Sequence, residues 1–296
     1  MTPRDDGARI DEDVIDAIGA LGNRTRLEIL LALAEAERDR QEQWLRMSFT
    51  ELYDAVDVSS TSQFSYHLDR LVGPFLAETD GGYRLTYGGD KIVRTLLAGF
   101  YENTRRFDDT DVDGVCVFCG SESLVATVDR ERFVVRCDAC ESRLLTDLLP
   151  RSQTRHRSAE EVVDSVGARI WGSVTLIRDG VCPECYGVVE TTVESHPRDD
   201  RTLYSLESTC RECWLAIHVP LEAIVAHHPA GTAFFREHDV FVFERPLWEF
   251  FECIAAETVT IDVATVDPFS AAVEITLDGE TRRFEIDDEL TVTPVS

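Results

Sequence analysis

Apolar residues recur at helical spacing over the first hundred positions of the chain. One helix is predicted from Asp11 onward, a second after Gly22-Asn23, a third from near Phe49 and a fourth after Ser59-Ser60. The fourth carries apolar residues at i, i+4 and i+7, namely Phe64, Leu68 and Leu71. Two short helices joined by a tight turn form a helix-turn-helix unit, so we expect one over the third and fourth helices.

A β-hairpin is predicted directly after the fourth helix. The alternating segments Phe75–Thr79 and Tyr83–Thr86 flank Asp80-Gly81-Gly82, a turn sequence typical of hairpins. A hairpin in this position is the wing of a winged helix-turn-helix domain. Gly88-Gly89 then interrupts the pattern before an apolar helix that is predicted over Lys91–Phe107.

The rest of the chain alternates between short strands and helices. Residues 107–113 form an acidic linker, and Ser158-Ala159-Glu160-Glu161 is a capping box that starts a helix running to about Trp171. Paired strands are predicted at Leu124–Val128 with Arg132–Arg136, at Val188–Glu194 with Thr202–Glu207 around a turn over 195–200, and at the end of the chain over Thr258–Val266, Ala271–Leu277 and Thr281–Ile286, with Asp278-Gly279 as a hairpin turn.

Eight of the nine cysteines form four Cys-x-x-Cys knuckles. They fall into two sets, Cys116, Cys119, Cys137 and Cys140, then Cys182, Cys185, Cys210 and Cys213. The knuckles are separated by 17 residues in the first set and by 24 in the second, which is typical of zinc ribbons with four cysteine ligands. Four such ligands leave no position for water, so we expect two structural Zn²⁺ sites without catalysis by the metal.

Other interpretations of the cysteines remain open from sequence alone. Ligation by four cysteines also suits iron in a rubredoxin-like site, and a disulfide framework is disfavoured in a reducing cytosol. The turns Cys119-Gly120 and Cys185-Tyr186-Gly187 are expected to point backbone N–H groups at the sulfurs.

Cys253 is expected to be a buried small hydrophobic residue rather than a redox sensor. His227-His228 is expected at a helix C-terminus rather than at a ligand site.

The chain thus predicts an α+β fold with four parts. These are a winged helix-turn-helix domain over residues 10–107, a zinc-ribbon-like β module over 114–149, a helix with a second such module over 158–218, and helices with antiparallel strands over 219–296. The two modules resemble a degenerate internal repeat. They can act as inert staples, protein-docking modules or nucleic-acid binders, and the C-terminal part as an effector pocket or an oligomer interface.

The charge of the chain is unusual. The formal net charge is −27, and a single lysine, Lys91, accompanies 28 arginines. Acidic, lysine-poor surfaces suit molar salt, where the Debye length falls to about 3 Å, so we expect a haloarchaeal cytosol. An apolar fraction of 44% argues against disorder. No apolar run approaches the ~20 residues of a membrane span, and Met1–Asp13 lacks an apolar signal segment, so we expect a cytoplasmic protein.

Two segments carry a family resemblance. The run from Ala20 to Leu30, ALGNRTRLEIL, resembles the opening of ArsR-type winged helix-turn-helix regulators, and Gln63–Val72, QFSYHLDRLV, resembles the recognition helix of archaeal members. The match covers about residues 10–107. It implies a homodimer on a palindromic DNA operator, joined through the first and last helices of the domain. Glu51–Val56 contains no Cys or His, so soft-metal sensing in the helix before the recognition helix is not expected.

The side of the fourth helix opposite its apolar residues is the candidate DNA-reading face. It presents Ser62, Gln63, Tyr66, Asp69 and Arg70, with Ser59 at its start, and Arg84 lies on the predicted wing. Gln pairs with adenine, and Ser, Tyr and Arg contact bases or phosphates. Residues 1–106 hold 13 basic and 19 acidic residues, a net charge of −6. Because counterion release contributes little in molar salt, binding there would depend on groove contacts.

The predicted function is therefore that of a DNA-binding transcriptional regulator with structural zinc. The alternative is an interaction module of the transcription machinery, whose winged helix and ribbons bind protein instead of DNA. The chain has no phosphate-binding Gly-rich loop, dinucleotide fingerprint or His-Glu-x-x-His motif, so we do not expect an enzyme.

Overall fold

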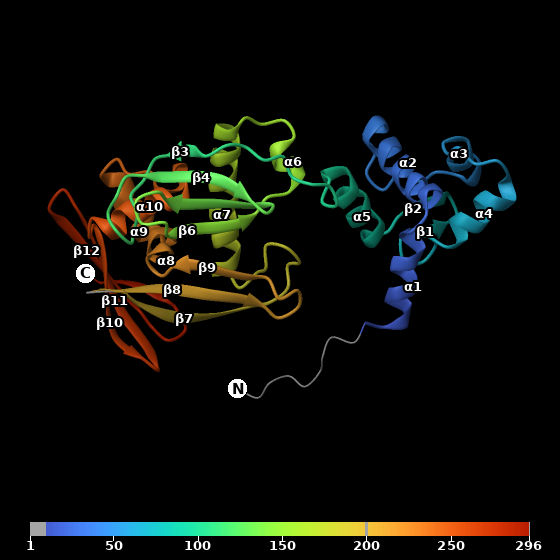
Figure 1. Cartoon of the computed structure of the whole chain (residues 1–296). Coiled ribbons are helices and arrows are strands. Elements are labelled where there is room, and N and C mark those ends of the chain that lie inside the picture. The colour runs from blue at the N-terminus through green and yellow to red at the C-terminus, as the bar shows by residue number, and fades with distance from the viewer. Residues whose placement is uncertain (1–9, 199–200, 296) are drawn as a thin grey trace. The chain divides into compact units, whose positions relative to one another are not determined.

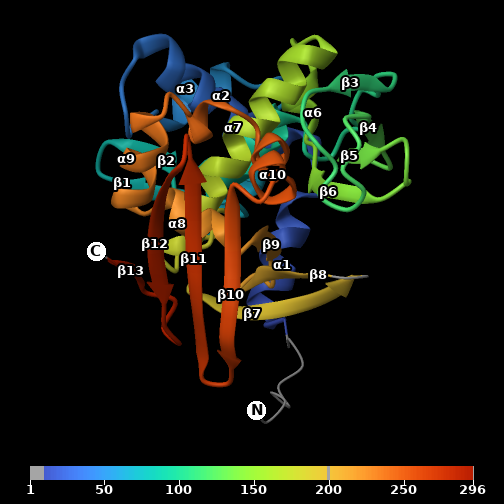
Figure 2. The same ribbon diagram turned by 90° about the vertical axis from the view of Figure 1, so that its left-hand side faces the viewer.

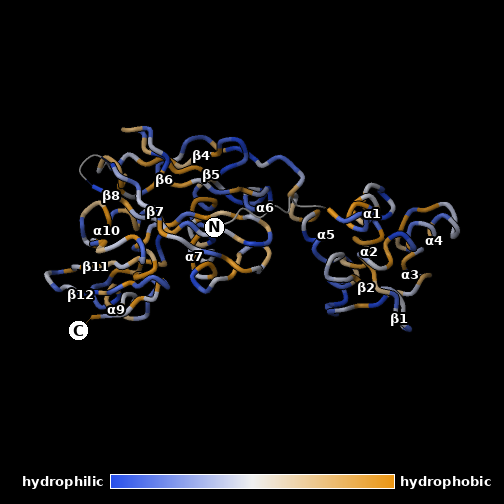
Figure 3. Tube along the Cα trace, turned by 90° about the horizontal axis from the view of Figure 1, so that it is seen from below, coloured by the Kyte–Doolittle hydropathy of each residue, from blue (hydrophilic) through white to orange (hydrophobic). Residues whose placement is uncertain are grey.

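The computed structural model describes residues 10–198 and 201–295. The chain divides into two compact units, residues 1–103 and 104–296 (Figure 1). Helices and antiparallel sheets are mixed along the chain. In Figure 3 hydrophobic and hydrophilic stretches alternate throughout, and no helix of the described residues is long and apolar enough to cross a bilayer.

The N-terminal unit is a small helical domain with one hairpin. Its elements are α1 (Glu12–Leu21), α2 (Arg24–Arg40), α3 (Phe49–Asp54), α4 (Thr61–Asp69), β1 (Leu76–Thr79), β2 (Gly82–Leu85) and α5 (Tyr87–Ala98). Local capping sets several helix starts. The Asn23 side chain accepts a hydrogen bond from the Arg26 N–H at the start of α2, and Ser48 with Glu51 forms a capping box on α3.

The core of this unit lies between α2, α4 and the hairpin. Phe64 is fully buried and Leu68 is 1% exposed, so the apolar face of α4 packs inward as its periodicity predicts. The helix ends at Asp69, so Leu71, which was predicted on the same face, is buried in the turn that follows. Met47 exchanges two backbone hydrogen bonds with Tyr83 of β2, at 2.8 and 3.0 Å, which ties the entry to α3 to the hairpin. A side chain at Gly82, where φ is +114°, would collide with the Met47 carbonyl.

The last helix of the unit differs from the sequence prediction. Gly88 and Gly89 do not interrupt the chain but lie in the first turn of α5, where the Thr86 hydroxyl accepts a hydrogen bond from the Gly89 N–H. A Cβ on Gly89 would lie 2.2 Å from the Phe75 carbonyl oxygen, so glycine serves close packing here. The helix ends at Gly99 in a left-handed conformation, well before the predicted Phe107.

The C-terminal unit combines three antiparallel sheets with helices (Figure 2). The first sheet contains β3 (Thr110–Val112), β4 (Leu124–Asp129), β5 (Arg132–Cys137) and β6 (Arg143–Leu148); the second contains β7 (Val189–Arg198), β8 (Arg201–Cys210) and β9 (Ala216–Pro220); the third contains β10 (Val259–Val266), β11 (Phe269–Leu277), β12 (Glu280–Ile286) and β13 (Val292–Val295). The helices are α6 (Arg151–Thr154), α7 (Ala159–Arg178), α8 (Glu222–His227), α9 (Pro229–Glu237), the 3-10 turn η1 (Val242–Glu244) and α10 (Leu247–Ala255).

Helix α7 connects the parts of this unit. It runs behind β4–β6 toward β8 and β9 (Figure 1) and buries eight residues, among them Val166, Ile170 and Val174. Its Trp171 donates an indole hydrogen bond of 2.7 Å to the Arg245 carbonyl. A single hydrophobic cluster extends from Cys116 to Ile286. The three segments that the sequence separates after residue 113 therefore share one core.

Several strand ends extend beyond the prediction. β7 continues to Arg198 and β8 begins at Arg201, so the segment predicted as a turn over 195–200 is mostly strand, and Asp199 and Asp200 lie outside the described residues. β3, β6, β9 and β13 were not predicted. Each of these four strands lies at the edge of its sheet and shows a mixed burial pattern, which explains its weak sequence signal.

Two glycines of α7 give a matched test of its packing. A Cβ on Gly167 would lie 2.9 Å from the Pro246 Cβ, whereas nothing lies within 4 Å of one on Gly172. We expect Gly167→Ala to lower the free energy of unfolding by about 1–3 kcal/mol through overpacking. Gly172→Ala should raise it by up to about 1 kcal/mol through helix propensity. Thermal unfolding in molar KCl measures both, and equal shifts would contradict the contact with Pro246.

Candidate functional site

The structure brings the eight predicted cysteines together in two groups of four. In the first, the Sγ atoms of Cys116 and Cys140, and those of Cys119 and Cys137, lie 3.7 Å apart. In the second, Cys182 and Cys213 are 3.6 Å apart, and Cys185 and Cys210 are 3.5 Å apart. A tetrahedral ion with Zn–S bonds of about 2.3 Å separates its sulfurs by about 3.8 Å. A disulfide would need about 2.05 Å, so the geometry fits a metal ion.

All four knuckles have the same backbone. The N–H of each first cysteine donates to the carbonyl five residues later, at 2.8–2.9 Å, and its own carbonyl accepts from the N–H four residues later, at 2.9–3.2 Å. The residue four after the first cysteine is left-handed in every knuckle: Gly120 (φ +71°), Glu141 (φ +59°), Tyr186 (φ +64°) and Trp214 (φ +61°). This loop aims backbone N–H groups at sulfur, as the 3.4 Å contacts from Glu184 to Cys182 and from Glu212 to Cys210 illustrate.

The turn of the third knuckle differs from the sequence expectation. The left-handed residue is Tyr186, and Gly187 follows it with an ordinary backbone. Gly187 is required for another reason, because a Cβ there would lie 2.8 Å from Cγ of Glu212 and 3.2 Å from Sγ of Cys185. Glycine at this position thus lets the two knuckles of the second group approach each other.

The two groups occupy equivalent places in their sheets. Each has a first knuckle before a strand (β4 or β7), a second knuckle starting at the end of the next strand (β5 or β8), and a third strand after it (β6 or β9). The residue before the third cysteine pairs with the residue six after that cysteine in both groups, as Arg136 with Arg143 and as Thr209 with Ala216. The register supports the interpretation of an internal repeat.

Electrostatics favour a cation at these groups. Burial raises the pKa of the Cys116 thiol to about 12, so this side chain would stay protonated without a positive charge beside it. Hydrogen bonds from the Ser142 hydroxyl and N–H lower the pKa of Cys140 to about 6. The donor set of four sulfurs, supported by backbone N–H groups, suits a soft or borderline dication such as Zn²⁺. With four protein ligands, such a site has no open position for a substrate.

The candidate DNA-reading residues lie as the helical periodicity predicts. Ser59, Ser62, Gln63 and Arg70 are exposed, as is Asp69, and Tyr66 is 55% exposed. The Ser59 hydroxyl donates a 3.0 Å hydrogen bond to Oε1 of Gln63, which leaves the Gln63 amide N–H groups available for other partners. The Arg70 guanidinium lies over the Tyr66 ring at 5.9 Å.

Arg84 occupies a different environment from these residues. It is half-buried on β2, where its guanidinium donates a 3.2 Å hydrogen bond to the Leu85 carbonyl and lies 5.8 Å from the Trp44 ring centre. Trp44 itself is 65% exposed and was not among the predicted site residues. Arg84 on the hairpin therefore contacts other groups than the residues around Tyr66 on α4.

The remaining candidates have local structural roles. Cys253 is partly buried against the core, and burial raises the pKa of its thiol to about 11. His227 is the last residue of α8, and its ring contacts the Ala223 carbonyl at 3.1 Å and the Thr175 hydroxyl at 3.3 Å. His228 accepts a hydrogen bond from the Ala230 N–H and begins α9. Among the described residues, only the two cysteine groups have the spacing of a metal site.

Two aromatic residues beside the second group were missed from sequence. Tyr186 is 61% exposed and Trp214 is 68% exposed, and each directly follows an exposed cysteine, Cys185 or Cys213. Their position in the knuckle could have identified them from sequence. The residue after the second cysteine of a knuckle is left-handed and is favoured to be glycine, so a large aromatic residue there is unusual.

These features define a protein with an N-terminal helical domain and two four-cysteine groups able to hold metal ions. Two family models match the chain, both described as domains of unknown function: DUF7351 over residues 113–292 and DUF7347 over residues 14–96. The first covers more than half of the chain, which therefore belongs to the DUF7351 family. No curated protein and no solved structure matches the chain.

The ninth cysteine provides a control for metal binding. We expect elemental analysis to find two zinc ions per chain in the purified protein and one in the double variant Cys182→Ser/Cys210→Ser. Cys253→Ser should retain both. Because bound zinc contributes on the order of 10 kcal/mol to folding in such sites, the double variant should also unfold at a clearly lower denaturant concentration. Folded wild-type protein without bound metal would contradict the assignment of two metal sites. Stoichiometric iron instead of zinc would show that the sites hold iron.

Proposed function

We propose that this chain is a DNA-binding transcriptional regulator of the ArsR-like winged-helix type, with two structural zinc ribbons and no catalytic activity. The observation that carries the proposal is the division of α4 into two faces. One face is buried through Phe64 and Leu68, and the other exposes Gln63 and Tyr66. The order of α3, turn, α4 and hairpin is that of a domain which inserts its second helix into the major groove.

A homodimer on a palindromic operator accompanies this proposal. Val14, Ile15 and Ile18 form an apolar stripe on α1 with exposed fractions of 46%, 57% and 62%. Phe100 and Tyr101, just after α5, are 58% and 76% exposed. Exposed apolar groups of this size on helices that pack on α2 favour burial against a second copy of the chain.

The acidity of the N-terminal part constrains how DNA would be bound. With a net charge of −6 over residues 1–106, long-range attraction to phosphates is absent. Molar salt shortens the Debye length to about 3 Å, which removes most of the repulsion as well. Base contacts and groove shape would then supply the affinity, and this requirement fits an exposed face that mixes Gln63, Tyr66 and Ser62.

The reading face can be tested on operators recovered by genome-wide mapping of bound sites in the native host. We expect Gln63→Ala and Tyr66→Ala each to weaken operator binding about 5- to 150-fold in molar KCl, because a base contact contributes about 1–3 kcal/mol. Gln43→Ala, an exposed change in the loop before α3, should leave the affinity unchanged. Equal affinity of all four proteins would contradict direct readout by α4.

A second candidate function is protein binding at the second four-cysteine group. Non-glycine residues with positive φ cost about 1–2 kcal/mol relative to right-handed backbone, and neither Tyr186 nor Trp214 is buried in return. The equivalent positions of the first group hold Gly120 and Glu141. Aromatic residues placed at a strained, exposed position favour a contact with a partner. Glu184 and Glu212, exposed beside them, favour a basic segment of that partner.

Stability measurements separate a binding role of Trp214 from a packing role. We expect Trp214→Gly to leave the free energy of unfolding unchanged or to raise it by up to about 1 kcal/mol, since glycine relieves the positive φ but gains entropy in the unfolded chain. Trp171→Ala, which removes a buried ring, should lower it by about 3–5 kcal/mol. A similar loss in both variants would show that Trp214 supports the fold.

A further inference from the structure

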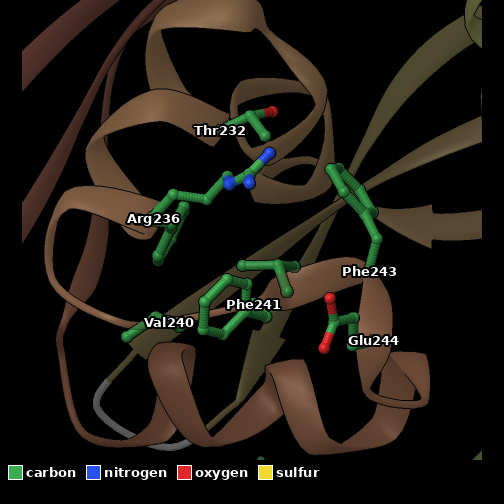
Figure 4. A pocket seen from close by; sticks show the side chains of 8 residues that line it. Thr232, Arg236, Val240, Phe241, Phe243 and Glu244 are labelled. Atoms are coloured by element: carbon green, nitrogen blue, oxygen red, sulfur yellow. The ribbon is translucent and has the colours of Figure 1, made fainter.

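The C-terminal unit contains a ring-sized pocket between α9 and η1. Its volume is about 140 Å³. An engineered apolar cavity of about 150 Å³ accommodates benzene, so one aromatic ring fits a space of this size. Figure 4 shows Phe241, Phe243 and Val240 along its wall, with Thr232, Arg236 and Glu244 as its polar groups. All of these side chains belong to the single core unit that follows residue 103.

Arg236 supplies a positive charge without a compensating partner. Arg236 is exposed, and among the described residues none forms a hydrogen bond or ion pair with its guanidinium. Figure 4 shows this group beside Thr232. Arg236 and Thr232 also line an adjoining open depression that contains Arg178, His227 and Glu237. In a chain with a net charge of −27, an arginine left unpaired at the mouth of an apolar pocket favours an anionic ligand.

Glu244 lines the same pocket but does not pair with Arg236. Figure 4 places its carboxylate away from the guanidinium, below Phe243. The pocket therefore offers a cation, an anion and aromatic walls at separate positions. This arrangement complements a ligand that carries a carboxylate and an ammonium group on a body the size of one ring.

We propose that this pocket binds a small carboxylic acid with one aromatic or similarly sized apolar group. The Arg236 guanidinium holds the carboxylate through two parallel hydrogen bonds, and Phe241 and Phe243 contact the ring. The same chemistry is available from a free α-amino acid such as phenylalanine, or from an acid without an amino group. Glu244 distinguishes these sources, because only the amino acid presents an ammonium group to it.

Calorimetric titration of the full-length protein in molar KCl tests the proposal with three probes. L-phenylalanine and 3-phenylpropanoate carry the carboxylate, and 2-phenylethylamine lacks it. We expect at least one of the two carboxylates to bind with a dissociation constant of about 1 mM or tighter, which is usual for about a dozen non-hydrogen atoms. We expect 2-phenylethylamine to bind at least tenfold more weakly. Binding of neither carboxylate, or equal binding of the amine, would overturn the proposal.

Variants locate the ligand within the protein. Arg236→Gln should weaken carboxylate binding about tenfold or more, whereas Arg132→Gln, an exposed arginine at the start of β5, should leave it unchanged. Phe241→Ala, which alters an already exposed ring, should weaken binding with little effect on the unfolding temperature. Unchanged binding in Arg236→Gln would refute the site.

The variant Glu244→Gln distinguishes the two classes of ligand, a free amino acid and an acid without an amino group. If the ligand is an amino acid, this variant should weaken phenylalanine binding severalfold and leave 3-phenylpropanoate unaffected. If the ligand is a simple acid, 3-phenylpropanoate should bind more tightly than phenylalanine to the wild type. Both results support the pocket, and equal loss of the two ligands would contradict the role of Glu244. None of these measurements involves DNA, so their failure leaves the regulator proposal standing.

Discussion

The C-terminal unit depends on how the negative charge of eight cysteine sulfurs is compensated. The sulfurs lie in two clusters, in which pairs of Sγ atoms are 3.5–3.7 Å apart. Four sulfurs at these distances repel when ionised, and a buried thiol such as Cys116 resists ionisation by itself. A dication at the centre of each group would resolve both problems. The groups also hold together residues that are distant in sequence, such as Cys182 and Cys213, and so fix where β7, β8 and β9 begin and end. The first cysteine of every knuckle is buried, and those of the first group, Cys116 and Cys137, belong to the hydrophobic core.

The two modules share their backbone but differ in what they present to solvent. Identical hydrogen bonds, left-handed residues and strand registers show that the knuckle loop determines the local geometry in both. The first module fills the left-handed positions with Gly120 and Glu141, and the second with Tyr186 and Trp214. Because the scaffold tolerates glycine there, the aromatic residues are not needed for the loop. The repeat therefore separates a stabilising element, common to both modules, from a surface that only the second carries.

Local patterns in the sequence were sufficient to predict the elements that have strong local causes. The spacing of Phe64 and Leu68 predicted the buried face of α4, and the four knuckles predicted the two cysteine groups. Features determined by tertiary contacts were missed. Gly88-Gly89 indicated a break because its close packing on Phe75 is invisible in sequence. The edge strand β6 lacks a clear alternation of buried and exposed residues, and β9 is only five residues long. The pocket at Arg236 has no motif, since its walls come from α9, η1 and the segment between them.

Salt determines which of these surfaces can function in a strongly acidic protein. At about 1 M salt the Debye length of about 3 Å confines electrostatics to direct contact. Most of the arginines that form ion pairs in the structure make direct contacts of this kind on the surface. Examples are Arg94 with Asp90 at 2.6 Å and Arg283 with Glu274 at 2.8 Å. Exposed pairs of this kind contribute little to stability. Arg236 differs because it lines a pocket with aromatic rings and pairs with no carboxylate among the described residues, so an anion that reaches it can contact its guanidinium directly. The same reasoning applies to α4, where Tyr66 and Gln63 would act through short contacts that salt does not screen. In molar salt, both proposed recognition surfaces would therefore depend on shape and short contacts and not on the overall charge.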